Sequence, residues 1–248
     1  MKRVFFFLTI LAVFILPQAV FAVVNANANM GDMVNSYKGA QNLEQRLERL
    51  QDLGKSMIEK RLQDLQHAED LLNQATHISQ ATKDELATVI NDNQSKLTEL
   101  EGDIAVEDDI TACKDLVHAI IQDYRVYIVV LPQIHGMAVA DKLSGFADKL
   151  DELKAKAQEK TNELKNDGKN VETIETLITE AGSAITAART DIDEAQAKFE
   201  SMSIPEWEQS ITLRQQGRQE LVSARQNLNN ARQSLMNAVN AIKTLASE

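Results

Sequence analysis

The residue types that most often do chemistry are sparse in this chain, and their spacing does not favour a site. The 248 residues include four histidines and one cysteine, none of them in an HExxH motif or another spacing typical of metal ligands. Cys113 and His118 are five positions apart, which places them on divergent faces of a helix. No glycine-rich phosphate loop or nucleophile elbow is present. We therefore expect no enzyme activity, no metal site and no cofactor, and we expect Cys113 to be a small core residue.

An acidic cluster in "EGDIAVEDD", residues 101–109, offers the other candidate chemistry. Carboxylates bind Ca²⁺, but this cluster lacks the Asp/Asn alternation and the distal Glu of a known calcium loop. We expect instead a solvated turn whose carboxylates favour the N-terminus of the following helix.

The stretch "IQDYRVYIVVLPQIHGMAVADKL", residues 121–143, differs from the polar chain around it. An unbroken apolar run from Val126 to Leu131 ends at Pro132. A helix that is apolar on all sides is buried on all sides, so we expect core here, with Pro132 ending or kinking the helix. Two tyrosines are expected to close the edge of this core, with their hydroxyls reaching water. The candidate interaction or membrane segment consists of Tyr124, Tyr127, Val129, Leu131 and Pro132.

The N-terminus, "MKRVFFFLTILAVFILPQAVFA", combines two positive charges, a short apolar region and small residues before a cleavage point. This pattern predicts a secretory signal peptide over residues 1–22 with cleavage after Ala22, although retention as an anchor is left open. Cleavage leaves 24 basic and 37 acidic residues, a net charge of −13, which disfavours nucleic acid and anionic membranes as partners. A flexible arm over 23–40 and a helical bundle over 41–248 would follow.

Hydrophobic spacing predicts about six helices, and we expect an all-α, elongated antiparallel bundle or coiled coil. The first helix starts near Asn42, and the second starts at Thr82 as N-cap, with Glu85 three residues later. Asn93 stands in the seam of the second helix, where a polar residue can set register. The third helix covers about 110–131, and the fourth runs from Pro132 to "NDGKN" at 166–170, which supplies a C-terminal glycine.

The last two predicted helices share a heptad pattern with one large and one small column. The fifth has aliphatic residues at 171, 178, 185 and 192, with alanines at 181, 188 and 195. The sixth, opened by Pro205, repeats the pattern with leucines at 221, 228 and 235 beside a small column that includes Ala231. A link of a few residues between them predicts an antiparallel hairpin over 170–248.

The segment "DYRVYIVVLPQ", followed by "ADKL", resembles a Tyr-Arg-Val-Tyr, aliphatic, Pro segment of a group of uncharacterised secreted bacterial helical proteins. The resemblance covers about residues 100–165 and implies a bacterial, exported, all-helical protein. It implies no functional residue.

Two main functions fit these observations. The first is an exported, non-enzymatic spacer or protein-interaction module in the cell envelope or outside the cell, with an unknown protein partner. Self-association through exposed coiled-coil faces is left open. The alternative is a membrane-active protein that releases the apolar segment 126–140, although each arm is too short to span a bilayer alone. An enzyme or ligand carrier with a pocket between helices is a third hypothesis.

Overall fold

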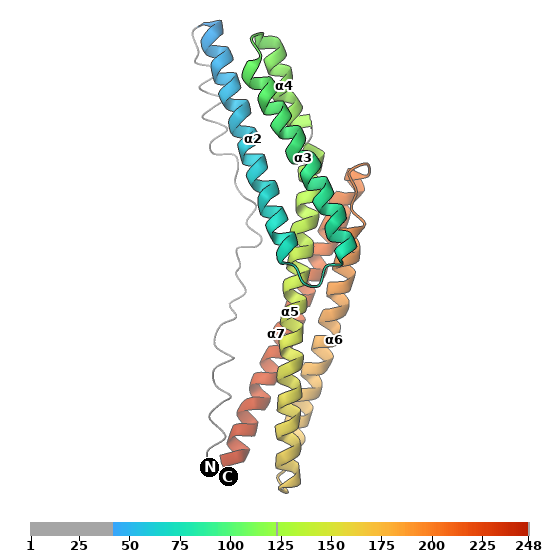
Figure 1. Ribbon diagram of the computed structural model, residues 1–248. Helices are drawn as coiled ribbons and strands as arrows, with labels where there is room; N and C mark the ends of the chain where they lie inside the picture. The colour runs from blue at the N-terminus through green and yellow to red at the C-terminus, as the bar shows by residue number, and fades with distance from the viewer. Residues whose placement is uncertain (1–41, 123, 248) are drawn as a thin grey trace.

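The computed structural model describes residues 42–122 and 124–247, and this part of the chain consists of helices joined by short turns, without strands (Figure 1). The helices are α2 (Leu43–Gln74), α3 (Gln80–Val106), α4 (Ile110–Gln122), α5 (Tyr124–Asn166), α6 (Glu172–Glu200) and α7 (Trp207–Ser247). The prediction of an all-α, elongated bundle is confirmed. The signal peptide and the N-terminal arm, predicted over 1–22 and 23–40, lie outside the described residues.

Two helical bundles follow one another along the long axis, and α5 belongs to both (Figure 1). In the N-terminal bundle α2 packs against α3 and α4, and the first part of α5 packs on α2. In the C-terminal bundle α5, α6 and α7 pack against one another. The predicted antiparallel hairpin of α6 and α7 is therefore present, with α5 as a third helix along it.

The ends of α2 and α3 follow local capping chemistry. Helix α2 starts at the predicted place, and Asn42 caps it, because its side-chain oxygen accepts from the amide of Gln45 at 2.8 Å. The N-cap of α3 is Ser79, whose hydroxyl accepts from the amide of Thr82. The prediction of Thr82 as N-cap is wrong, because Ser79 supplies the same chemistry three residues earlier. Asn93 donates to the carbonyl of Val89 in its own helix, so its amide makes no register-setting bond to a neighbouring helix.

Helix α5 passes through Pro132 without ending, which corrects the prediction that a helix ends there. A proline inside a helix removes one hydrogen bond and costs ~3 kcal/mol. The residues on both sides offset this cost, since Val129, Val130 and Ile134 are all buried. Helix α5 therefore includes the whole apolar run as well as the segment predicted as the fourth helix. Tertiary packing has overridden the local preference of Leu131, the residue before the proline.

The heptad columns of α6 and α7 face inward, as predicted. The buried positions of α6 are Ile174, Ile178, Ala181, Ile185, Ala188, Ile192, Ala195 and Phe199. The small column of α7 is buried at Gly217, Ala224, Ala231 and Ala238. The glycine of "NDGKN" ends α5, because Gly168 takes a positive φ of 80° and Lys169 donates to the carbonyl of Leu164.

A close contact joins the three helices of the C-terminal bundle. The ring of Phe199, which is fully buried, lies against Gly136 of α5 and Gly217 of α7. A Cβ added at either glycine would lie closer than 3.0 Å to a carbon of this ring. Both helices therefore need a residue without a side chain to receive it.

Candidate functional site

The candidate segment of α5 lies where the two bundles meet (Figure 1). Val129 is fully buried, and Leu131 and Pro132 are half-buried, so the prediction that this run is core is confirmed for the described side chains. From 127 to 147 the helix exposes only Lys142. Tyr124 begins α5, but its side chain lies outside what the structure describes.

Tyr127 packs under a cation from the neighbouring bundle helix. The guanidinium carbon of Arg61, on α2, lies 4.4 Å from the centroid of the Tyr127 ring. Such a cation–π contact contributes ~0.5 to 2 kcal/mol, depending on desolvation. The hydroxyl oxygen of Tyr127 is buried, so the prediction that it reaches water is wrong. The sequence could not show the contact with Arg61, because Arg61 belongs to another helix and is distant in sequence.

One turn beyond Leu131, two imidazoles meet across α2 and α5. The ring centroids of His67 and His135 are 5.8 Å apart. Burial lowers the pKa of His135 below 6.5, His67 and Lys142 lower it further, and Asp64 partly opposes them. His135 is therefore neutral at pH 7. No histidine spacing in the sequence indicated this pair, which is 68 positions apart.

A buried carboxylate holds the α2–α3 turn against α5. One carboxylate oxygen of Asp141, which is 8% exposed, accepts from the backbone amides of Thr76 and His77, each at 2.5 Å. The Nε2 atom of His77 lies 3.1 Å from Asp148, which also accepts from Arg189 of α6 at 2.7 Å. The Arg189 hydrogen bond, followed by that of His77, holds the pKa of Asp148 below its usual range. This network fixes the junction by polar contacts as well as by apolar packing.

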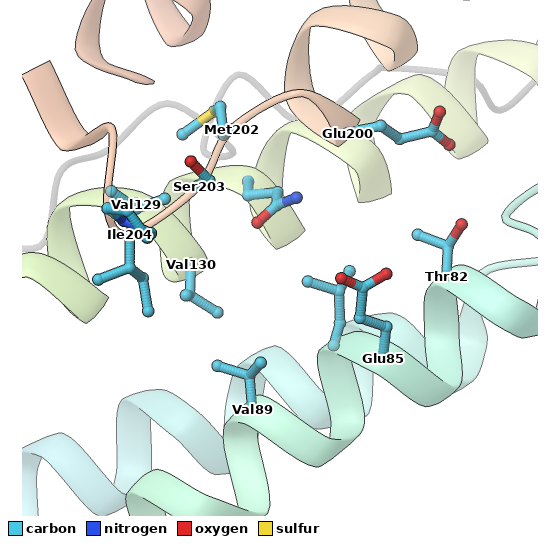
Figure 2. A pocket seen from close by; sticks show the side chains of 12 residues that line it. Thr82, Glu85, Val89, Val129, Val130, Glu200, Met202, Ser203 and Ile204 are labelled. Atoms are coloured by element: carbon cyan, nitrogen blue, oxygen red, sulfur yellow. The ribbon is translucent and has the colours of Figure 1, made fainter. Parts of the chain in front are cut away.

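A partly enclosed cavity of about 310 Å³ lies at the junction. Its walls come from residues 82–89 of α3, residues 129–133 of α5 and residues 200–205 at the end of α6 and the following turn (Figure 2). Most of the side chains that line it are apolar, and Glu85 and Glu200 bring carboxylates from two different helices.

The buried side chain of Gln133 also lines this cavity. It is 8% exposed, and its amide makes no hydrogen bond with any residue in the described ranges. Its amide is not among the fully buried polar groups of the described chain, so water in the cavity can satisfy it. In the sequence, Gln133 is a glutamine next to an apolar run. The hydrophobic pattern assigns this stretch to the core and does not indicate a cavity.

The other two candidates from the sequence, Cys113 and the acidic turn, have structural roles. Cys113 is fully buried, and burial raises the pKa of its thiol, as a core cysteine requires. In the acidic turn, a carboxylate oxygen of Asp109 accepts from the amides of Thr111 and Ala112 at 2.8 Å each. The prediction that the acidic turn supports the next helix N-terminus is confirmed for residues 107–109. The prediction of a turn over 101–106 is wrong, because these residues continue α3 to Val106.

Comparison with protein-family models, with curated protein sequences and with solved structures gives no match for this chain. Within residues 42–122 and 124–247, no group of three or more histidine, cysteine or acidic side chains is arranged to hold a metal ion. The described helices also include none with a stretch long and apolar enough to cross a membrane.

Proposed function

We propose that this protein is an exported, non-enzymatic helical spacer that presents a surface to a protein partner in the cell envelope or outside the cell. The predicted export signal over residues 1–22 and the resemblance of "DYRVYIVVLPQ" to secreted bacterial helical proteins support the compartment. The net charge of −11 for the whole chain favours a protein partner over nucleic acid.

The observation that carries the proposal is the continuity of α5. Its 43 residues extend about 65 Å at ~1.5 Å per residue, and it packs in both bundles. The α3–α4 turn lies at one end of the molecule, and the α5–α6 turn lies at the other (Figure 1). A continuous helix that is braced by neighbours along its length holds these two ends at a fixed separation.

The fixed separation can be measured with a pair of fluorophores. Asp108, in the α3–α4 turn, and Asp167, in the α5–α6 turn, are both exposed and can each be replaced by cysteine for labelling. A Cys113→Ala background keeps the buried native thiol from reacting. We expect one narrow distribution of energy transfer in single molecules. A broad or bimodal distribution would show that the bundles move relative to each other and would contradict a spacer.

Export is tested separately, with the full-length chain expressed in a bacterial host. The extracytoplasmic fraction should contain a product whose N-terminal sequence begins at Val23. Accumulation of the unprocessed chain in the cytoplasm would contradict this part of the proposal.

The non-enzymatic and partner-binding parts are tested on the processed chain. We expect no turnover that follows the protein through purification in a general esterase, phosphatase and glycosidase screen, and no near-unit metal occupancy by elemental analysis. Pull-down from envelope and culture-medium fractions should give a reproducible protein partner. Turnover without such a partner would favour an enzyme.

A further inference from the structure

We infer that a basic face on α5 and α7 binds a second copy of this chain through the acidic face of that copy's α3. This inference goes beyond the proposed spacer function and does not depend on it. Helices α5 and α7 lie together in the C-terminal bundle, whereas α3 lies in the N-terminal bundle (Figure 1). The contact therefore joins two different surfaces of the chain.

Helix α7 carries a single stripe of basic residues. Its members are Arg214, Arg218, Arg225, Arg232 and Lys243, which are separated by 4, 7, 7 and 11 positions. These separations are close to whole helical turns, so the five side chains leave the helix on one side. Within 221–247 α7 contains no acidic residue, so neither Arg225 nor Arg232 has a carboxylate three or four positions away in its own helix.

Three arginines of this stripe have no partner within the described chain. The guanidinium groups of Arg225 and Arg232 make no ion pair or hydrogen bond with another residue of 42–122 and 124–247. The Nε atom of Arg214 is buried and has no hydrogen-bond partner there. A chain with 37 acidic residues has many carboxylates that could pair with these arginines, so their lack of partners indicates a surface that meets an external anion.

Helix α5 adds a second row of cations beside this stripe. The members of this row, which are exposed and seven positions apart, are Lys142, Lys149 and Lys156. Glu152 and Glu159 lie within four positions of these lysines, so α7 carries the larger share of the uncompensated positive charge.

Contacts with α6 show that the two rows border the same seam. Arg189 of α6 contacts Asp148 on one flank of α5, and Asn227 on one flank of α7 donates to Asp191 of α6. The lysines and arginines lie on the opposite flanks of α5 and α7, away from α6. Because α5 and α7 also pack against each other, the two rows together form one basic face.

The acidic face of α3 has a matching repeat. It consists of Glu85, Asp92, Glu99 and Asp103, all exposed. The first three are seven positions apart, which is also the spacing of the central arginines of α7, and none of them forms an ion pair with another described residue. Lys96 is the one basic residue within 85–103, so this face keeps an excess of negative charge.

Each face also offers apolar contact. Val222, which is 58% exposed, lies between Arg218 and Arg225 on α7, and Val106, which is 82% exposed, follows Glu99 by seven positions on α3. Opposite charges with the same repeat, next to apolar side chains, pair helices of different chains. The net charge of −11 repels two copies at long range, but salt at 0.1 M screens charges more than about 10 Å apart, whereas the two faces act in contact.

Sedimentation equilibrium of the processed chain tests the inference, and we expect reversible association that increases with concentration. Arg225→Glu combined with Arg232→Glu should weaken self-association roughly tenfold or more, because attraction becomes repulsion. Asp92→Lys combined with Glu99→Lys should have the same effect. An equimolar mixture of these two double variants should associate again, since each supplies the face that the other lacks.

A control separates the two faces from net charge. Lys55→Glu combined with Lys114→Glu changes the net charge by as much as the arginine variant does, at exposed positions of α2 and α4, and should leave association unchanged. Helical circular dichroism and thermal unfolding check that each variant folds. If the arginine variant does not fold, Arg225→Gln combined with Arg232→Gln takes its place, and it should also weaken association.

Three outcomes would overturn the inference. The parent chain may be monomeric at every concentration, or associate as strongly as both double variants, or give double variants whose mixture does not associate. Binding of anionic lipid vesicles or duplex DNA through Arg225 and Arg232 by a monomeric chain would assign the basic face to a different anion and would also overturn it. Because the readout is association alone, it can fail while the spacer measurement succeeds, or the reverse.

Discussion

Substitution of Gly136 by alanine tests the packing that joins the three helices of the C-terminal bundle. The new Cβ would lie closer than 3.0 Å to carbons of the Phe199 ring, well inside van der Waals contact. The ring cannot withdraw, because it is fully buried and also lies against Gly217. Accommodation therefore requires α5 to move away from α6 and α7, or the ring to leave its rotamer.

The magnitude follows from two opposing effects. Replacing glycine by alanine inside a helix stabilises it by ~1 kcal/mol, whereas overpacking a core costs ~1 to 3 kcal/mol or more. Gly102 provides the matched control, because it lies inside α3 and an added Cβ meets nothing within 4 Å. Gly102→Ala should therefore stabilise the protein. The free energy of unfolding of Gly136→Ala should lie ~1 to 3 kcal/mol below that of Gly102→Ala.

The assay is urea unfolding followed by helical circular dichroism, with free energies compared only where the m-values agree. Phe199→Leu should destabilise the parent, but it should cost less in the Gly136→Ala background, because the smaller side chain leaves room for the methyl group. If Gly136→Ala is as stable as Gly102→Ala, the close contact between Gly136 and Phe199 does not exist and the reasoning is refuted.

Three further substitutions test the core, the seam and the buried imidazole. The Val129→Asp variant loses ~1.5 to 3 kcal/mol of hydrophobic burial and places a carboxylate in the core, so the variant should melt at a lower temperature or fail to fold. If the parent permeabilises vesicles and a well-folded Val129→Asp variant does not, the membrane alternative would be supported instead. Ala231→Leu should cost ~1 to 3 kcal/mol by overpacking the α6–α7 seam, whereas Leu at the exposed neighbour Asn230 should change stability by less than about 0.5 kcal/mol, and equal losses in urea unfolding would show the seam is misassigned. Burial lowers the pKa of His135 from 6.5, so between the lowered pKa and about pH 6.5 the unfolded chain binds a proton at His135 that the folded chain does not bind. The contribution of His135 to the free energy of unfolding is therefore full above about pH 6.5 and is lost as the pH falls toward the lowered pKa. Urea midpoints measured across this range should show a slope that His135→Leu reduces, and an unchanged slope would contradict the assignment.

The helices could be predicted because their signal is local. The column through Ile178, Ile185 and Ile192 repeats every seven residues, and each member is buried as expected. Pro132 misled the prediction for a physical reason: its effect on the preceding residue is local, but the burial of Val129 and Ile134 on either side involves helices that are distant in sequence.

The candidate site could be predicted only in part. The apolar segment indicated the correct part of α5, because an aliphatic run within a polar chain can be recognised from the sequence alone. The cavity could not be predicted from the sequence, because Glu85, Gln133 and Glu200 come from three segments that are distant in sequence and meet only in the fold. The pairing of His67 with His135 was missed for the same reason.

The sharing of α5 between the two bundles also bears on how the chain can be divided. α5 contributes a wall to each bundle, so cutting the chain within it would expose apolar faces on both fragments. Neither bundle is therefore an independent domain that could be separated from the other at a linker. We expect the described chain to unfold in a single cooperative calorimetric transition.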